Sequence, residues 1–162
     1  MHDKLTIREI SDSHDPALKD VVRMFQAMYD EDWDGQSLDL AKDGPEVWLK
    51  GVTKGLGRFV VILVAETGGK NIGFAHGNLR ILPDYFGNHK VGFISHIYID
   101  GIARKKGVGK LLVRRLETWF AEKQVHSVEL DVLLSNPAGL AFWESMGYTA
   151  EMRRCRTKGS NL

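Results

Sequence analysis

The alternation of apolar and polar positions along the chain predicts a mixed α/β protein. Residues 5–10 alternate in the manner of a half-buried strand. Apolar residues then recur at helical spacing after Asp15-Pro16, and Asp43-Gly44-Pro45 is typical of the start of a second helix that runs to about Lys54. The first third of the chain is therefore expected to hold one strand and two helices.

The pattern in the remaining two thirds of the chain predicts further strands and two more helices. Two apolar runs joined by a Gly-Gly turn indicate a hairpin over Phe59–Glu66 and Ile72–Leu82. Further strands are expected over Val91–Asp100, Ser127–Leu133 and Thr149–Thr157, and helices over residues 108–123 and Pro137–Ser145. The order β-α-α-β-β-β-α-β-α-β indicates one mixed sheet flanked by helices.

The composition favours a single soluble domain over residues 1–162, because 43% of the residues are hydrophobic. The formal charge of +1 gives no electrostatic support to nucleic-acid binding. A single cysteine, Cys155, excludes an intrachain disulfide. The longest apolar run, near residues 59–65, is too short to span a membrane, so we expect no membrane partner and a cytoplasmic location.

The most informative segment, Ile99–Leu112, predicts a strand, a basic glycine-containing loop and the first turn of a helix. Backbone N–H groups and the helix dipole favour an anion at such a helix start. Gly107 and Gly109 lack a Cβ and allow close approach of a phosphate. The spacing matches neither the P-loop nor the dinucleotide fingerprint. A pyrophosphate site and an ordinary helix start are the two interpretations.

Two motifs together resemble those of the GNAT superfamily of N-acetyltransferases. The first is Arg-x-x-Gly-x-Gly at residues 104–109, and the second is the helix from Asn136 to the pair Gly147-Tyr148. The resemblance implies an α/β three-layer sandwich with two splayed parallel strands, here Val91–Asp100 and Ser127–Leu133. It also implies acetyl-coenzyme A as the cofactor, an amine substrate and a homodimer.

The resemblance also assigns residues to the coenzyme. The opened strand would hold the pantetheine arm, the basic loop the pyrophosphate, and the second motif would complete the site. The residues at these positions are Ile97, Tyr98, Ile99, Arg104, Lys105, Lys106, Gly107, Val108, Gly109, Lys110, Asn136 and Trp143. A helix N-cap is the alternative role for Asn136, and packing is the alternative for Tyr98.

The catalytic positions depart from the family pattern twice. A Glu is usual shortly before the coenzyme loop, but Ser95-His96-Ile97-Tyr98 stands there, so His96 becomes the candidate base, with a structural histidine as the alternative. Trp143 stands where many members have the Tyr that protonates the thiolate, and an indole N–H is no acid at physiological pH. Tyr148 is the nearest substitute, and unassisted departure of the thiolate is the alternative.

An acidic and aromatic segment after the first predicted helix is the candidate acceptor site. It contains Tyr29, Asp30, Glu31, Asp32 and Trp33. These residue types suit a small cationic amine, although a solvated loop is the alternative. Together with the resemblance to the GNAT superfamily, this implies an N-acetyltransferase in which the amine attacks the thioester directly, with no metal. A protein or peptide acetyltransferase and a catalytically weak acyl-coenzyme A sensor are the alternatives.

Overall fold

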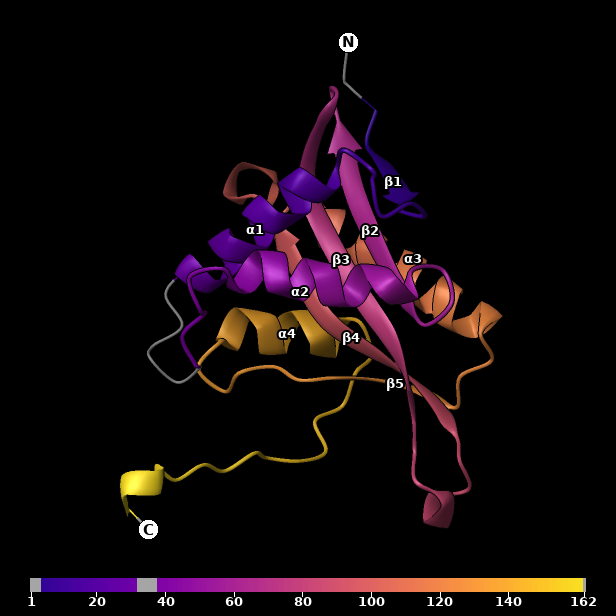
Figure 1. The fold of residues 1–162 in the computed structure, drawn as a ribbon, viewed down its shortest axis with the longest axis vertical. Helices are drawn as coiled ribbons and strands as arrows, with labels where there is room; N and C mark the ends of the chain where they lie inside the picture. The colour runs from indigo at the N-terminus through magenta and orange to yellow at the C-terminus, as the bar shows by residue number, and fades with distance from the viewer. Residues whose placement is uncertain (1–3, 32–37, 162) are drawn as a thin grey trace. The chain divides into compact units, whose positions relative to one another are not determined.

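The computed structural model describes residues 4–31 and 38–161, and the chain divides into two compact units, Met1–Asp131 and Val132–Leu162. The first unit holds a sheet with the strand order β1-β2-β3-β4-β5 (Figure 1). Its strands are β1 (Thr6–Glu9), β2 (Val60–Thr67), β3 (Lys70–Ile81), β4 (Lys90–Ile99) and β5 (Ser127–Leu130). The first four pair antiparallel and β5 pairs parallel to β4, so the predicted mixed sheet is confirmed.

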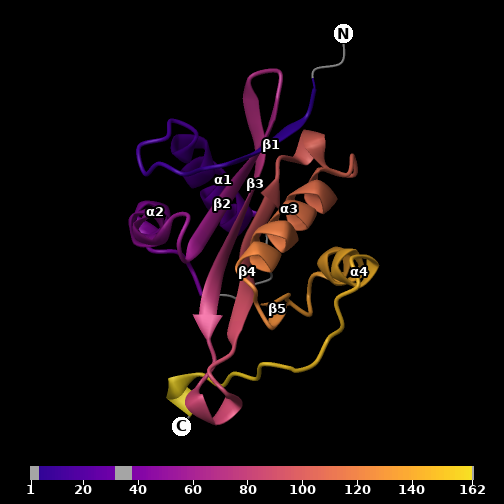
Figure 2. The same cartoon turned by 90° about the vertical axis from the view of Figure 1, so that its right-hand side faces the viewer.

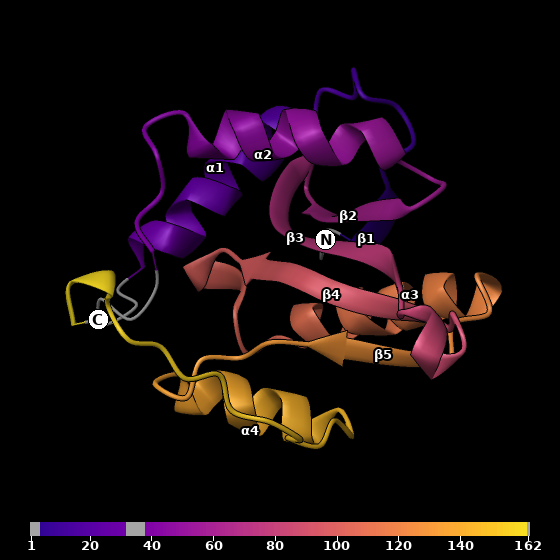
Figure 3. The same cartoon turned by 60° about the horizontal axis from the view of Figure 1, so that its bottom comes forward.

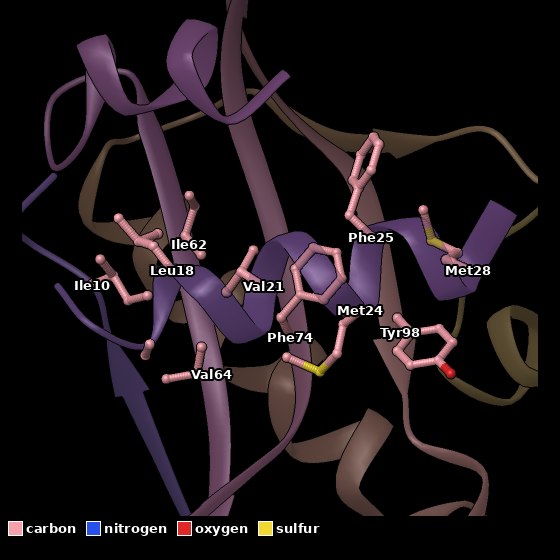
Figure 4. Close-up of a cluster of buried hydrophobic side chains, with 11 residues drawn as sticks. Ile10, Leu18, Val21, Met24, Phe25, Met28, Ile62, Val64, Phe74 and Tyr98 are labelled. Carbon is pink, nitrogen blue, oxygen red and sulfur yellow. The ribbon is translucent and has the colours of Figure 1, made fainter. Parts of the chain in front are cut away.

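Helices cover both faces of this sheet. Figure 2 shows α1 (Leu18–Asp30) and α2 (Gly44–Val52) on one face and α3 (Val108–Glu122) on the other. The apolar residues of α1 recur at the predicted helical spacing and pack on β2, β3 and β4 (Figure 4). They are Leu18, Val21, Met24, Phe25 and Met28, packed against Ile62, Val64, Phe74 and Tyr98.

Two glycines let α3 approach the opposite face closely. A Cβ on Gly77 or Gly92 would lie 2.7 or 2.6 Å from the ring of Phe120, a distance that real Cβ atoms do not reach. Any larger residue there would push α3 away from β3 and β4. Because α3 begins at the basic loop, this packing also fixes the position of that loop relative to β4.

The pairing of β4 changes at a β-bulge. His76 lies opposite His96 and Gly77 lies opposite Ile94, so Ser95 is an extra residue without a partner on β3. The Ser95 hydroxyl donates to the Asn78 side-chain oxygen at 2.7 Å, which holds the bulge in place. β5 pairs with β4 only over Val91–Ile94, the residues before the bulge.

The bulge explains why one predicted strand is shorter than expected. The sequence predicts a strand over Ser127–Leu133, but β5 ends at Leu130, opposite Ile94. Figure 3 shows β5 beside the first half of β4 only. Beyond Ser95, β4 therefore has an edge that no strand of the described residues covers.

The second unit contains α4 (Pro137–Ser145), as predicted, but the predicted strand over Thr149–Thr157 is wrong. Residues 148–158 form neither helix nor strand. Ala150 and Met152 would share a strand face with Arg154, so neither face of such a strand is continuously apolar. Met152 is accordingly 90% exposed.

Candidate active site

The open edge of β4 carries free backbone groups. Asp100 N–H donates to the Ile72 carbonyl at 2.8 Å, which makes these two residues a hydrogen-bonded pair of the antiparallel ladder. Such pairs alternate, so Tyr98 also bonds to β3, whereas Ile97 and Ile99 turn their N–H and C=O groups away from β3. Ile97 and Ile99, two of the three residues of β4 predicted to contact the pantetheine arm, thus present backbone N–H donors at the open edge.

The basic loop leads from this edge into α3. A 3₁₀ turn over Gly101–Ala103 comes first, and Gly107, with φ of 82°, takes the N-cap position of α3 without a side-chain cap. The N–H groups of Val108, Gly109 and Lys110 have no acceptor within the helix at this position. A Cβ on Gly107 would meet only open space, so a ligand could reach these donors.

Charge around the helix start suits an anion. Lys105, Lys106 and Lys110 are exposed at the loop and at the first turn of α3. Uncapped N–H groups, the positive end of the helix dipole and nearby lysines are features that favour an anion such as a diphosphate at this position.

Arg104 is held by another part of the chain. It forms an ion pair with Glu31 at the C-terminal end of α1, and its Nε donates to the Ile99 carbonyl at 2.8 Å. The Tyr98 hydroxyl donates to the same Glu31 carboxylate at 2.8 Å. The hydrogen bond to Glu31 raises the pKa of Arg104. Glu31, predicted to bind the acceptor, and Arg104, predicted to bind the coenzyme, therefore bind each other in this structure.

His96 lies next to a second histidine that the sequence analysis did not identify. The Nδ1 atoms of His76 on β3 and His96 on β4 are 3.1 Å apart, and the rings are stacked with an interplanar angle of 18°. Phe25 from α1 and Trp48 from α2 cover the pair. His76 is 4% exposed, whereas His96 is partly exposed.

Burial keeps both imidazoles neutral at physiological pH. It lowers the pKa of His96 to about 4. Burial, followed by the charge of His96, lowers the pKa of His76 to about 3. His96 therefore has an unprotonated ring nitrogen at neutral pH, as a general base requires, but the low pKa makes it a weak one.

A pocket of about 230 Å³ lies at the end of α1. It is lined by Gln26, Tyr29, Asp30, Leu38, Asp39 and Leu40. The Gln26 side-chain amide donates to Asp30 at 2.8 Å. The predicted acceptor residues Tyr29 and Asp30 therefore line a pocket that also holds a second carboxylate, that of Asp39. Asp32 and Trp33, predicted for the same site, lie outside the described residues.

Aromatic rings connect this pocket to the histidines. The ring of Tyr29 lies 5.1 Å from that of Phe25, and the ring of Phe25 lies 5.0 Å from that of His96. Phe25 therefore lies between the ring of Tyr29, which lines the pocket, and the ring of His96.

The remaining predicted residues belong to the second unit. The Asn136 side-chain oxygen accepts the Gly139 N–H at 2.9 Å, so Asn136 caps α4. Trp143 is 8% exposed, and its ring meets that of Tyr148 edge to face at 5.2 Å. Tyr148, the candidate acid, is thus packed against Trp143, the residue at the position where many family members have the acidic Tyr.

Residues 4–31 and 38–161 contain neither a candidate membrane span nor a candidate metal site. None of the helices there is long and apolar enough to cross a membrane. No group of three or more His, Cys, Asp or Glu residues in those ranges is arranged to hold a metal ion.

Comparisons with known proteins extend this picture. Residues 18–148 match the sequence model of the acetyltransferase (GNAT) family. The search of curated proteins gave no significant match.

Solved structures with the same fold include two aminoglycoside acetyltransferases. One is aminoglycoside N-acetyltransferase AAC(6')-Iy in complex with coenzyme A, with 17% identity over 96% of this chain and 95% of that chain and a TM-score of 0.76. The other is an aminoglycoside acetyltransferase from an uncultured soil metagenomic sample in complex with sisomicin, with 19% identity over 95% and 94% of the two chains and a TM-score of 0.71. A transcriptional regulator from Bacillus halodurans has 20% identity over 96% and 99% of the chains and a TM-score of 0.74.

Proposed function

The chain belongs to the acetyltransferase (GNAT) family, and we propose that it transfers the acetyl group of acetyl-coenzyme A to a primary amine of a small cationic molecule. Acetyl-coenzyme A is the cosubstrate of this family. The family match crosses both compact units, which supports one acyltransferase domain over residues 1–162. We expect a homodimer from the family resemblance alone and a cytoplasmic location from the sequence.

The observation that carries the proposal is the open edge of β4 next to the uncapped start of α3. Lys105, Lys106, Lys110 and the first N–H groups of α3 would hold the diphosphate of the coenzyme. The free N–H groups of Ile97 and Ile99 would bind the pantetheine arm and the oxyanion that forms at the thioester carbonyl. A strand paired on both sides along its whole length could offer neither of these two N–H groups.

His96 would accept the proton that the attacking ammonium group must lose. Its partial exposure and unprotonated ring nitrogen suit this role. The amine nitrogen then forms a bond to the acetyl carbon while the bond from that carbon to sulfur breaks, and the second proton of the nitrogen passes to the departing thiolate. A thiol has a pKa of about 8.5, so the thiolate can leave without an acid, and Tyr148 need not take part.

A cationic acceptor is the best fit to the pocket at the end of α1. Asp30 and Asp39 supply negative charge, and Tyr29 supplies an aromatic face for an alkylammonium group. Two of the structural neighbours are aminoglycoside acetyltransferases, which supports polyamines and aminoglycosides as the first compounds to test.

Calorimetric titration with acetyl-coenzyme A, with dephospho-coenzyme A and NAD as controls, is the first test. Selective micromolar binding followed by acetyl transfer to a cationic amine is the expected result. Absence of binding would overturn the assignment of the loop, and transfer to peptides but not to free amines would replace the proposed substrate class.

An acyl-coenzyme A sensor is the second candidate function. The low pKa of His96 and the absence of the usual Glu favour it, because both weaken proton removal from an ammonium group. Tight binding of acetyl-coenzyme A without turnover on any amine would support this alternative.

A further inference from the structure

We propose that His76 is a positioning residue that accepts a hydrogen bond from Nδ1 of His96, so that His96 turns an unprotonated Nε2 toward the amine. This inference rests on the proposed acetyl transfer and on His96 as the proton acceptor. His76 touches neither substrate in this scheme and acts only through His96.

The fold places the two imidazoles directly opposite each other. His76 and His96 are register partners on β3 and β4, immediately next to the bulge at Ser95. Their Nδ1 atoms are 3.1 Å apart, a distance at which one nitrogen donates and the other accepts. In this hydrogen bond one of the two neutral rings carries its proton on Nδ1 and the other does not, and this difference decides which nitrogen of His96 remains unprotonated.

The side chain of His76 makes one polar contact with the described residues, the hydrogen bond between its Nδ1 and Nδ1 of His96. It is 4% exposed, and its Nε2 is buried without a hydrogen-bond partner. The ring of Trp48 lies 5.4 Å away at 81° to the His76 ring. A buried imidazole is unfavourable compared with an apolar side chain unless its hydrogen bonds are made. The bond to His96 is thus the feature that distinguishes His76 from a leucine at this position.

The chemistry of the protonated state fixes the direction of the bond. When Nε2 of His96 takes the proton of an ammonium group, both ring nitrogens of His96 carry hydrogen. Nδ1 of His96 can then only donate, and the Nδ1 lone pair of His76 must accept. The amine keeps its electron pair for attack on the acetyl carbon, and the proton on Nε2 later passes to water.

A hydrogen bond to a charged donor is stronger than one between neutral groups. His76 therefore stabilises the imidazolium form of His96 more than the neutral form. The other rings that cover His96, those of Phe25 and Trp48, do not titrate and supply no charge. Of the ring neighbours of His96, His76 is thus the one that can offset the effect of burial on its basicity.

Two substitutions test the role of this bond in turnover. His76→Leu removes the acceptor at similar volume, and His76→Asn keeps an acceptor near the position of Nδ1. We expect His76→Leu to lower kcat by about 10- to 100-fold, the worth of a hydrogen bond to a charged group, with an unchanged KM for acetyl-coenzyme A. His76→Asn should restore most of the rate. His89→Leu, in the exposed His89–His126 ring pair, is the matched control and should have no effect.

A double-mutant cycle separates positioning from general damage to the fold. In a His96→Ala background, His76→Leu should have no further effect on kcat, because its partner is absent. An equal loss in both backgrounds, or no rescue by asparagine, would overturn the proposal and make His76 a purely structural residue.

Nitrogen NMR of the imidazoles tests the bond without any assay of activity. We expect neutral His96 to carry its proton on Nδ1 and to have an unprotonated Nε2, and His76→Leu to abolish this preference. The reverse tautomer would overturn the proposal even in an active enzyme. The expected tautomer in a protein that acetylates no amine would support the bond while refuting the proposed function.

Discussion

At the scale of single residues, Arg104 shows how a local motif and a distant contact assign different roles to one side chain. Its place in Arg-x-x-Gly-x-Gly predicts a contact with the coenzyme, whereas the structure pairs it with Glu31. The two residues are 73 positions apart, and no local pattern predicts that they meet. The proposed anion site would therefore rely on three lysines and backbone N–H groups rather than on Arg104.

Replacing Glu31 tests this division of roles. Glu31→Gln removes the charge that holds Arg104, so we expect the guanidinium group to become available to the phosphates. The affinity for coenzyme A should rise about two- to fivefold, and the free energy of unfolding should change by less than about 1 kcal/mol, because the pair is exposed. Calorimetric titration and urea unfolding measure the two effects. Glu46→Gln, an exposed change on α2, is the control.

A fall in coenzyme affinity in Glu31→Gln would contradict this expectation. It would mean that the ion pair holds Arg104 in a position from which the guanidinium group also reaches the phosphates.

At the scale of elements, the start of α3 was predictable from the sequence and the shape of β4 was not. A basic loop with Gly107 at the N-cap is a local signal, and the structure has the helix start at that point. The bulge at Ser95 depends on the pairing of β4 with β3 and β5, which hydrophobic periodicity does not fix. His76 was missed for the same reason, because its role follows from the residue opposite to it.

The predicted phosphate loop can be tested with a matched pair of glycines. Gly107 and Gly57 both have positive φ, 82° and 73°, and a Cβ on either would meet open space. Asp at either position should therefore impose similar backbone strain. We expect Gly107→Asp to weaken coenzyme A binding at least about tenfold, by placing a carboxylate in the anion site, and Gly57→Asp to leave it unchanged. Equal affinities of the two variants, measured by calorimetry, would exclude the loop as the phosphate site.

At the scale of the whole molecule, burial of two histidines links stability to pH. Their pKa values, about 3 for His76 and about 4 for His96, lie below the value of about 6.5 that each has in the unfolded chain. Between these values the unfolded chain binds more protons than the folded one, so acid favours unfolding. The fold is therefore expected to lose stability as the pH falls below about 6.5, before most carboxylates titrate.

Urea unfolding at pH 7 and pH 5 checks this expectation. Each histidine should lower the free energy of unfolding by about 2 kcal/mol at pH 5 relative to pH 7, as an order of magnitude. His76→Leu removes one of the two groups and should reduce the pH dependence by about half. An unchanged difference between the two pH values in this variant would show that other groups cause the acid sensitivity.

The global arrangement was largely predictable because α1, α3 and β2 follow simple periodicities and each buries one continuous apolar face or run. The ends of the chain's later elements were less predictable. β5 stops where β4 bends away from it, which no feature of Ser127–Leu133 signals. The segment 149–157 contains apolar residues that suggest a strand, but Arg154 and Arg156 would fall on the same face as Ala150 and Met152.

Because Ser95 is an extra residue in β4, the open edge of this strand depends on the number of residues in the strand and not on which side chains they carry. A chain that lacks only Ser95 would keep Ile94 on the face of α3 and His96 on the face of α1, because ordinary alternation already places neighbours on opposite faces. The strand could then run straight and pair with β5 along its whole length. Every residue proposed for catalysis would be present, and the gap between the strands would close. We therefore expect deletion of Ser95, an uncharged residue, to remove the site more completely than any single substitution within it.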